Sequence, residues 1–416
     1  MTGTQEEVRN IVLLGATGSI GTTAARVIEH LNRREEGTRF RLCGLAAERS
    51  WEKLRDMAAR FDCHNLALAD TDAARRLKSE LPGATVFTGE AAAEELIRAT
   101  ASQTDIVIGA IVGIAGLRAS LATLDEGTDL ALANKETLVA AGHLVTQTAA
   151  RTGAAILPVD SEHSAIWQSL QGAGGERQGL ADCTPPCNVS NIVHRIILTA
   201  SGGPLREATA AEIRGATVER VLAHPTWNMG AKVTVDSASL TNKALEIIEA
   251  HHLFGLPGEQ ISTIIHPQSI VHSIVEYLDG SMISQMGVPD MGTPVQYALT
   301  SPQRPRGVVE RLDLSAHGLL EFYPPDGERF PALQLAYEVM RDDAGTSGAV
   351  FNAANEEAVQ AFLRGEIRFG DITVLAAESL ERVESHPVTS LDEIFEADRR
   401  AREFVRGRIR KGIATF

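Results

Sequence analysis

The sequence predicts an α/β protein with three parts: an N-terminal Rossmann-like, doubly wound domain, a second α/β domain and a C-terminal helical bundle. Short apolar runs alternate with amphipathic stretches over roughly the first 160 residues, a β-hairpin pattern follows, and helical segments end the chain. A chain of 416 residues is long enough for about three domains with large cores.

The alternation of strands and helices begins near Asn10. Strands are expected where the runs are short and almost continuously apolar: 11–14, 40–46, 66–69, 105–111, 129–133 and 154–159. Amphipathic stretches between them predict helices at 50–61, 91–99, 117–124 and 136–152. Because strands that are apolar on both faces need helices above and below them, this pattern is typical of a parallel, doubly wound sheet.

The middle of the chain has a mixed α/β pattern. Strands are expected at 195–200, 261–265 and 269–278, and a helix at 236–252. The turn Asp279-Gly280 joins the third of these strands to residues 281–287, which predicts a β-hairpin and therefore an antiparallel element. Residues 301–307 are rich in Pro and Arg and have the composition of a linker.

The end of the chain is helical. Apolar residues recur at helical spacing in the segments 330–341, 352–364, 372–384 and 391–411, which together predict a small bundle. Residues 171–191 contain glycines, prolines and two cysteines without any periodicity, so we interpret this segment as a surface insertion and assign it no function.

Composition excludes several classes of protein. Hydrophobic residues make up 44% and charged residues 22%, which rules out wholesale disorder. The net charge of −15 argues against a nucleic-acid or membrane partner, because both favour clusters of Lys and Arg. Four cysteines in so long a chain are too few for a disulfide framework, and we expect a cytoplasmic protein.

A glycine-rich turn follows the first predicted strand. Gly15-Ala-Thr-Gly-Ser-Ile-Gly21 opens a helix, where backbone N–H groups and the helix dipole can bind a pyrophosphate. Glycines also serve merely in tight turns, but the preceding strand and following helix favour nucleotide binding. After the second strand, Arg49 with Ser50 favours NADP, whereas Glu48 alone would favour NAD.

Polar side chains also follow two later strands, where the carboxyl edge of an open sheet binds ligands. Asn134, Lys135 and Glu136 follow one strand, although the same residues are also an ordinary helix start. Asp160 and Glu162 follow the next strand; at positions i and i+2 of an extended chain, both carboxylates would reach one hard cation. A helix-capping box is the alternative interpretation.

A polar stripe is expected on the helix at 236–252. Ser239, Asn242, Lys243 and Glu246 have the spacing of one helix face, while Leu240 can face the core. A solvated helix surface can have the same pattern. A cation, an amide, a hydroxyl and a carboxylate on one face nevertheless suit an anionic substrate and a metal-binding oxygen.

Two loops complete the candidate site. Ser201 lies in a glycine-containing loop after a strand, and residues 224–230 combine His224 with Trp227. Trp227 is either a core residue or part of a lid over bound substrate, since lids combine an apolar cover with small hinge residues.

The strings GATGSIG, LANKE, PVDSEH, TASGGP, HPTWNMG and DSASLTNKALE occur in this order, and FPALQLAYE and NAANEEAV follow. Together they closely resemble the 1-deoxy-D-xylulose 5-phosphate reductoisomerase family over nearly the whole chain. The resemblance implies an NADPH-binding domain at 1–159, a catalytic domain that binds metal and substrate at 160–294, a linker at 295–320 and a helical bundle at 321–416, arranged in a V and paired as a homodimer.

The resemblance also implies roles for individual positions. Cofactor contacts are implied for Thr17, Gly18, Ser19, Ile20, Asn134, Glu136 and Gly230, to which we add Arg49 and Ser50. Substrate contacts are expected for Lys135, Ser161, Glu162, Ser201, His224, Trp227, Ser237, Asn242, Lys243 and Glu246. Metal ligands are expected to be Asp160, Glu162 and Glu246, and the catalytic residues are expected to be Lys135, Glu162, His224 and Lys243.

The implied reaction rearranges 1-deoxyxylulose 5-phosphate to a branched aldehyde, which NADPH reduces to 2-C-methylerythritol 4-phosphate with the help of Mg²⁺, Mn²⁺ or Co²⁺. Three carboxylates suit such hard cations. Another NADP-dependent dehydrogenase of an aldehyde or hydroxy acid would leave the three carboxylates unexplained. A non-catalytic nucleotide-sensing protein would bind the cofactor without turnover.

Overall fold

The computed structural model describes residues 7–34, 37–171, 183–227, 229–342 and 344–412. Its contacts divide the chain into two compact units. Unit 1 comprises the residues up to 134 together with 147–164 and 290–310, and unit 2 comprises 135–146, 165–289 and the residues from 311 onward. The mixed α/β fold class predicted above is confirmed.

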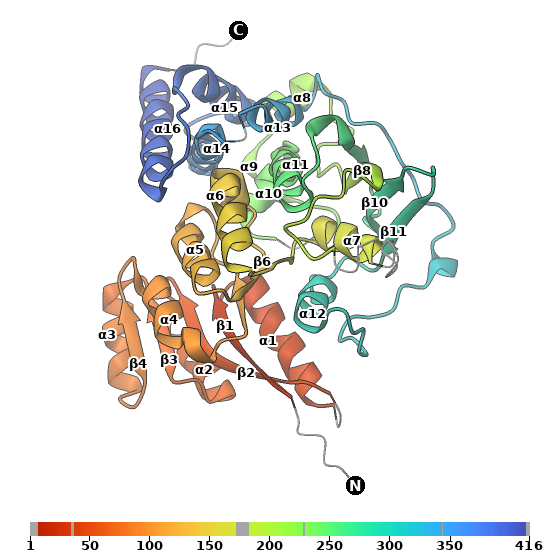
Figure 1. Ribbon diagram of the computed structural model, residues 1–416. Helices are drawn as coiled ribbons and strands as arrows, with labels where there is room; N and C mark the ends of the chain where they lie inside the picture. Colours follow the sequence, from red (N-terminus) through yellow and green to blue (C-terminus); the bar gives the residue numbers. More distant parts are fainter. Residues whose placement is uncertain (1–6, 35–36, 172–182, 228, 343, 413–416) are drawn as a thin grey trace. The chain divides into compact units, whose positions relative to one another are not determined.

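Unit 1 contains a seven-stranded parallel sheet in the order β4-β3-β2-β1-β5-β6-β7. Strands β1 to β4 and β6 are labelled in Figure 1. The strands are β1 Val8–Leu14, β2 Arg39–Ala47, β3 Asn65–Leu68, β4 Thr85–Thr88, β5 Ile106–Gly109, β6 Asp129–Leu132 and β7 Ile156–Pro158. The chain order reverses between β1 and β5, so a crevice at their carboxyl ends is the expected place for a ligand. Ile11, Val12 and Leu13 of β1 are completely buried, which anchors this strand in the core.

Helices flank this sheet. They are α1 Ser19–Asn32, α2 Trp51–Phe61, α3 Thr71–Glu80, α4 Ala92–Thr100, α5 Leu117–Asp125 and α12 Gly292–Thr300, with short 3-10 turns at Ala101–Gln103 and Ile114–Gly116. Two further helices, α6 Glu136–Thr152 and α7 Ser161–Leu170, contain residues of both units. The α12 helix packs on α1 and occupies the start of the predicted linker. The boundaries expected for the four domains stay predictions.

Strand β4 and helix α3 of unit 1 were missed from the sequence, and helix α12 lies largely where a linker was expected. Strand β4 is an edge strand whose Thr85 and Thr88 are exposed, so it lacks an apolar run. Helix α3 is largely polar and starts at Asp70, whose side chain accepts a hydrogen bond from the Ala73 N–H. A cap of this kind was the local signal that could have located the helix.

Unit 2 contains a four-stranded sheet in the order β11-β10-β8-β9. The strands are β8 Val193–Ala200, β9 Ile261–Ile265, β10 Val271–Tyr277 and β11 Met282–Met286. Strand β10 pairs antiparallel with both β8 and β11, whereas β8 and β9 are parallel. The predicted hairpin is confirmed: the Tyr277 N–H donates to the Ser281 carbonyl, and Gly280 has a φ of +85° that the tight turn requires.

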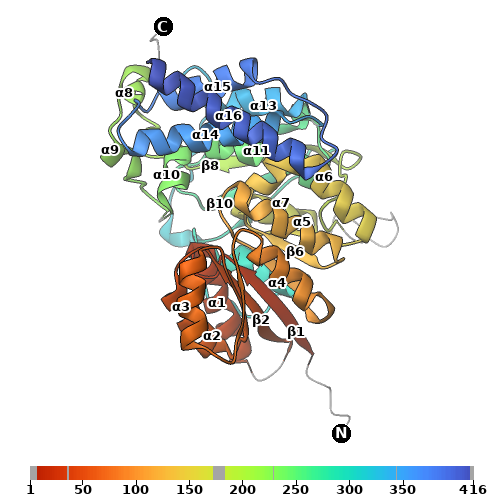
Figure 2. The ribbon, with the colours of Figure 1, turned by 90° about the vertical axis from the view of Figure 1, so that its left-hand side faces the viewer.

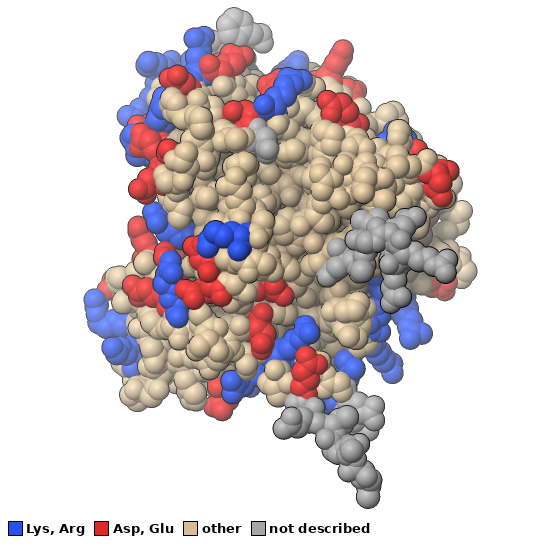
Figure 3. Space-filling view, in the orientation of Figure 1, with Lys and Arg blue, Asp and Glu red and all other residues tan. Residues whose placement is uncertain are grey.

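The C-terminal helices form the expected bundle (Figure 2). The helices of unit 2 are α8 Ala210–Arg214, α9 Val218–Leu222, α10 Ala231–Ala238, α11 Thr241–Phe254, α13 Ala332–Met340, α14 Ser347–Leu363, α15 Asp371–Arg382 and α16 Leu391–Lys411, with 3-10 turns at Gly258–Gln260 and Leu314–Ala316. Helix α14 packs against α15 and α16, and α11 packs against α13. Basic and acidic side chains lie close together over the region of α16 in Figure 3, and Arg399 of this helix pairs with Glu396 and Glu403.

The single helix expected at 236–252 is wrong. The helix is interrupted at Leu240, which has a φ of +58° and a buried side chain. Helix α10 therefore ends before Leu240, and α11 begins after it. Ser239 therefore does not share a face with Asn242. Its hydroxyl instead bonds to Thr241 and to carbonyls of α10.

Most of the segment interpreted as an insertion, residues 172–182, lies outside the described residues. Among the described residues, every helix is too short or too polar to cross a membrane.

Candidate active site

The glycine-rich turn between β1 and α1 is shaped by close backbone contacts. Gly15 has a φ of +75°, and a Cβ added there would lie 2.2 Å from the carbonyl oxygen of Ala110. A Cβ on Gly21 would lie 2.3 Å from the Gly15 carbonyl oxygen. Gly18 caps α1 without any side-chain hydrogen bond, so the first N–H groups of the helix are not capped by a side chain. This turn fits the pyrophosphate of a dinucleotide.

The other predicted cofactor residues of unit 1 lie near the carboxyl ends of its strands. Arg49 is the second residue after β2 and is exposed, and Ser50 caps α2 without a side-chain hydrogen bond. Thr17 and Ile20 are half-buried, while Ser19 is exposed. A guanidinium and a hydroxyl in this place suit a ribose phosphate.

Asn134 has a structural role that the sequence did not reveal. Its side chain is buried and donates hydrogen bonds to the carbonyls of Ile111 and Gly113, the latter at 2.8 Å. The side chain thus holds the loop that follows β5. A direct contact of Asn134 with the cofactor stays a prediction.

The carboxylates of Asp160 and Glu162 lie within 4.8 Å of each other. The extended geometry expected for them is wrong, because α7 begins at Ser161 and Glu162 belongs to its first turn. Asp160 accepts the Ser161 N–H at 2.9 Å, and the Ser161 hydroxyl donates to Glu162 at 2.5 Å. Asp160 thus makes a local bond at the start of the helix, while both side chains remain only partly buried. Two adjacent carboxylates are a donor set that a hard divalent cation favours.

The first polar cluster consists of Lys135, Asn242, Lys243 and Glu246, all in unit 2. The Lys135 ammonium donates to Asn242 at 3.0 Å and to Glu246 at 2.9 Å. Asn242 and Lys243 also donate to Glu246, whose side chain is 1% exposed. Two ammonium groups thus surround one carboxylate, and the excess positive charge suits an anionic ligand. The shared face predicted for Asn242, Lys243 and Glu246 is present.

The second polar cluster consists of Glu136, Lys232, Asp236 and Asn355, also in unit 2. The Lys232 ammonium lies 2.7 Å from Glu136 and 3.0 Å from Asp236, and the Asn355 amide donates to Asp236 at 2.8 Å. Burial alone would raise the pKa of Glu136, but the Lys232 charge lowers it below its usual value. Sequence reasoning missed Lys232, Asp236 and Asn355; the i, i+4 spacing of Lys232 and Asp236 was the available signal.

The hydrogen bonds of His224 define its tautomer. Its Nδ1 accepts the backbone N–H groups of Thr226 at 3.1 Å and Trp227 at 2.9 Å, so Nδ1 carries no proton. Nε2 therefore carries the proton and donates to the Ser201 hydroxyl at 3.1 Å. Burial lowers the pKa of His224, which keeps the imidazole neutral near pH 7. The site thus has a neutral N–H donor beside a hydroxyl.

Ser237 belongs to the same region of unit 2 as Ser201. The loop after β8 passes close to the end of α10, because a Cβ added to Gly203 would lie 2.8 Å from the Ser237 carbonyl oxygen. Trp227 is half-buried, and its ring centroid lies 6.4 Å from that of His272. Gly230 is exposed and caps α10. Trp227 is therefore not a fully buried core residue.

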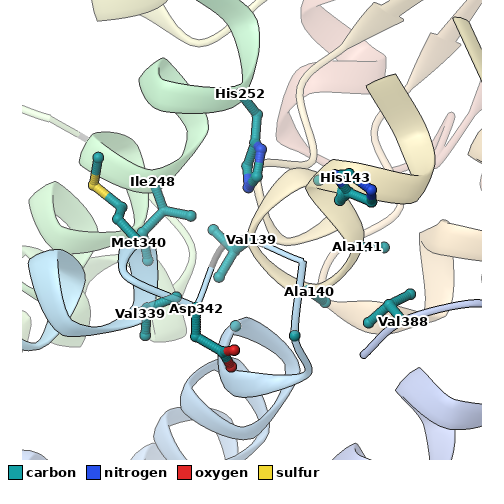
Figure 4. Close-up of a pocket in the computed structure, with 13 residues that line it drawn as sticks. Val139, Ala140, Ala141, His143, Ile248, His252, Val339, Met340, Asp342 and Val388 are labelled. Carbon is teal, nitrogen blue, oxygen red and sulfur yellow. The ribbon is translucent and has the colours of Figure 1, made fainter. Parts of the chain in front are cut away.

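A small pocket in unit 2 is lined by a different set of residues (Figure 4). It surrounds the kink of α6 at Ala141, and its lining is largely apolar, with His143, His252 and Asp342 as polar members. A Cβ on Gly142 would lie 2.1 Å from the His252 ring, so this glycine permits close packing of α6 on α11. The pocket shares no residue with either polar cluster.

The predicted site residues divide between the two units. Unit 1 holds the glycine-rich turn, Arg49, Ser50, Asn134, Asp160, Ser161 and Glu162, and unit 2 holds both polar clusters together with Ser201, His224, Trp227, Gly230 and Ser237. Within unit 2 the structure brings Lys135 to Asn242, Lys243 and Glu246, and brings His224 to Ser201. The three-residue metal site stays a prediction.

Comparison with known proteins matches successive parts of the chain to one enzyme family. The family model for 1-deoxy-D-xylulose 5-phosphate reductoisomerase matches residues 11–142, that for its C-terminal domain matches 156–254, and the DXP reductoisomerase C-terminal domain model matches 286–404. The 1-deoxy-D-xylulose 5-phosphate reductoisomerase of Symbiobacterium thermophilum is 49% identical, covering 96% of this chain and 98% of that protein. The enzyme of Pelotomaculum thermopropionicum is 46% identical, with coverages of 95% and 97%.

Solved structures give the same result. The reductoisomerase of Zymomonas mobilis in complex with NADPH matches with a TM-score of 0.85 and 39% identity, covering 97% of this chain and 99% of that one. A DOX-P reductoisomerase in complex with NADPH, fosmidomycin and magnesium matches with a TM-score of 0.87 and 36% identity, covering 97% and 98%. The chain belongs to the 1-deoxy-D-xylulose 5-phosphate reductoisomerase family.

Proposed function

We propose that this chain rearranges 1-deoxy-D-xylulose 5-phosphate and reduces the product to 2-C-methyl-D-erythritol 4-phosphate, using NADPH and a divalent cation. The observation that carries this proposal is the first polar cluster, in which Lys135 and Lys243 surround the buried Glu246 in a member of this family. A simple dehydrogenase would not need such a cluster together with the carboxylates of Asp160 and Glu162. A cofactor-sensing protein would not turn over substrate.

NADPH supplies the hydride that reduces the aldehyde. The backbone N–H groups of Thr17, Ser19 and Ile20 would hold its pyrophosphate, since α1 begins there without a side-chain cap and the Gly18 N–H donates to the Gly15 carbonyl. Arg49 and Ser50 would bind the 2′-phosphate through charge-assisted hydrogen bonds. Glu136 and Gly230 are the further cofactor contacts that we propose in unit 2.

A divalent cation such as Mg²⁺, Mn²⁺ or Co²⁺ would supply Lewis-acid polarisation of the substrate carbonyl and the adjacent hydroxyl. We propose Asp160, Glu162 and Glu246 as its ligands, because all three offer the oxygen donors that such cations favour. Lys135 and Lys243 orient Glu246 through the hydrogen bonds described above.

Several hydrogen-bond donors of unit 2 are available for substrate oxygens. Ser201 and Ser237 would share the phosphate with Asn242 and Lys243, and Lys135 and Ser161 would bind hydroxyl oxygens. Because the proton of neutral His224 resides on Nε2, that atom donates a hydrogen bond beside Ser201. Trp227 would exclude water as part of a lid.

The activity is tested by following NADPH absorbance with 1-deoxy-D-xylulose 5-phosphate and Mg²⁺, and with each component omitted in turn. Asp160→Asn should lower kcat on the order of a hundredfold, because a ligand that acts in the transition state is lost. Asp72→Asn, a surface change on α3 of the same unit, is the matched control and should leave kcat unchanged. Full turnover in excess chelator would overturn the metal requirement.

We further infer that the chain forms a homodimer through β11, the edge strand of the described sheet of unit 2. Strand β11 ends the sheet of unit 2, and its Met282 and Ile283 are 56% and 46% exposed. Apolar side chains on an unpaired edge favour pairing with a second strand. Ile283→Lys should give a monomer in light scattering, whereas Val374→Lys on exposed α15 should leave the dimer intact. A monomeric wild-type chain would refute the inference.

We also infer a cytoplasmic location from the cysteines. Cys43 and Cys63 are buried thiols outside any disulfide, and burial raises the pKa of Cys63 to about 12. Thiols of this kind suit a reducing compartment. Fractionation of the native source would test the inference; recovery outside the cytoplasm would refute it.

A further inference from the structure

Lys232 lies beside both substrate-contact segments of unit 2 without being one of the predicted site residues. Its ammonium contacts Glu136, which directly follows Lys135, and Asp236, which directly precedes Ser237. We propose that Lys232 is a positioning residue, which holds Lys135 and Ser237 in place by binding the acidic residue next to each. This inference rests on the proposed function, because Lys135 and Ser237 are assigned to the substrate there.

The burial of these groups makes the contacts strong. The side chains of Lys232, Glu136 and Asp236 are 12%, 7% and 1% exposed, so water and salt screen their charges little. Burial alone would lower the pKa of Lys232, but Asp236 and Glu136, with a contribution from Glu356, raise it above its usual value. The pKa shifts of Lys232 and Glu136 therefore both favour the charged forms of the pair.

Asn355 extends the second polar cluster into the helical bundle. Its amide on α14 donates to the second oxygen of Asp236, at 2.8 Å. The next residue, Glu356, pairs with Arg402 of α16 at 2.5 Å. Asp236 is thus held on one side by Lys232 and on the other by α14, which fixes the end of α10 from which Ser237 projects.

The position of the first turn of α6 depends on Lys232 and on helix α14. Helix α6 is interrupted at Ala141, which has a φ of −144°, so the turn that begins at Glu136 is not simply a continuation of a long helix. The Val139 carbonyl lies against α14, because a Cβ on Gly348 would approach its oxygen to 1.9 Å. Packing on α14 and the bond to Lys232 therefore decide where Lys135 lies.

An ion pair used only for stability would be an unexpected choice here. Replacing buried ion pairs by well-packed apolar residues is often neutral or stabilising, because desolvation offsets the Coulomb attraction. Charged groups also add directionality, because the Lys232 ammonium, which is hydrogen-bonded to Glu136 and ion-paired with Asp236, defines the position of both carboxylates. That is the property needed to keep Lys135 and Ser237 in register with a substrate.

The test compares Lys232→Met with Arg408→Met. Arg408 pairs with Glu378 between α16 and α15, is also partly buried, and touches neither polar cluster, so it is the matched control. We expect Lys232→Met to lower kcat/KM for 1-deoxy-D-xylulose 5-phosphate on the order of a hundredfold, since small displacements of catalytic groups have effects of that size. It should weaken the binding of fosmidomycin with Mg²⁺, measured by calorimetry, to a similar extent.

A purely structural role would give a different result. Both variants would then melt at lower temperature but, when assayed well below the melting temperature and per folded molecule, would keep the wild-type kcat, KM and fosmidomycin affinity. That outcome would overturn the proposal. The control should keep the wild-type constants in either case, and a control that loses them as Lys232→Met does would also count against a specific role.

A milder variant covers the case in which Lys232→Met does not fold. Asn355→Ala removes one hydrogen bond to Asp236 and leaves the ion pairs in place, and it should lower kcat/KM and fosmidomycin affinity about tenfold. A folded Asn355→Ala protein with wild-type constants would overturn the proposal. If the wild-type enzyme itself shows no turnover, the proposed function fails, while fosmidomycin affinities still decide the role of Lys232.

Discussion

The glycine-rich turn allows a sharp test, because two of its glycines are required for different reasons. Gly15→Ala would place a Cβ 2.2 Å from the Ala110 carbonyl oxygen at a φ of +75°. The left-handed backbone costs about 1–2 kcal/mol for a non-glycine residue, and overpacking adds about 1–3 kcal/mol. We therefore expect Gly15→Ala to lower the free energy of unfolding by roughly 2–5 kcal/mol.

Gly18→Ala should leave the stability almost unchanged and weaken NADPH binding instead. Gly18 is exposed, has a φ of −80°, and an added Cβ meets only the Gly15 carbonyl oxygen, at 3.3 Å. The change in unfolding free energy should stay within about 0.5 kcal/mol. If the pyrophosphate binds at this turn, the methyl group would displace it from one N–H donor, a loss of about 1.5–3 kcal/mol, which weakens NADPH binding roughly tenfold to a hundredfold.

The assay measures both quantities for each variant. Urea titration gives the unfolding free energy, and quenching of protein fluorescence gives the NADPH dissociation constant without substrate or metal. Gly18→Ala with unchanged NADPH affinity would show that the cofactor does not bind at this turn. Gly15→Ala with wild-type stability would refute the steric reasoning.

Three further predictions concern single side chains. Arg49→Ala should raise the KM for NADPH roughly tenfold to a hundredfold, because a charge-assisted contact to the 2′-phosphate is lost, while NADH use changes little; an unchanged NADPH/NADH ratio would assign the role elsewhere. Trp227→Ala should lower kcat and weaken substrate binding with a near-normal melting temperature and abolish a fluorescence change on adding fosmidomycin with Mg²⁺, whereas a loss of about 3–5 kcal/mol in stability would mark a core residue. Burial lowers the pKa of His272 to about 4 from an ordinary 6.5, and His266 and Lys243 act in the same direction. Because the unfolded chain then binds the proton more readily than the folded protein, the free energy of unfolding should fall by about 3 kcal/mol as the pH falls from 6.5 to 4. Urea titrations across that range should show a shallower loss for His272→Gln, and an identical slope would contradict the assignment.

Local patterns were sufficient for much of the fold. The glycine spacing after β1, the Asp279-Gly280 turn and the apolar periodicity of α13 to α16 each involve residues close together in the chain, and the structure contains all of them. The same holds for Asn242, Lys243 and Glu246, which share a face because one helical turn brings them together. Periodicity failed at Leu240, where a buried side chain in a left-handed conformation divides one expected helix into two.

The second polar cluster shows what sequence alone does not determine. Lys232 meets Glu136 across 96 positions, and Asn355 meets Asp236 across 119, and no local spacing relates the members of either pair. Asn134 likewise had the pattern of a ligand-binding residue, yet its amide holds the loop after β5. The sequence by itself determined the kinds of elements and the chemical groups at their ends, because these depend on near neighbours. Only the tertiary structure decided which buried charges pair, because that depends on how helices distant in sequence pack and exclude water.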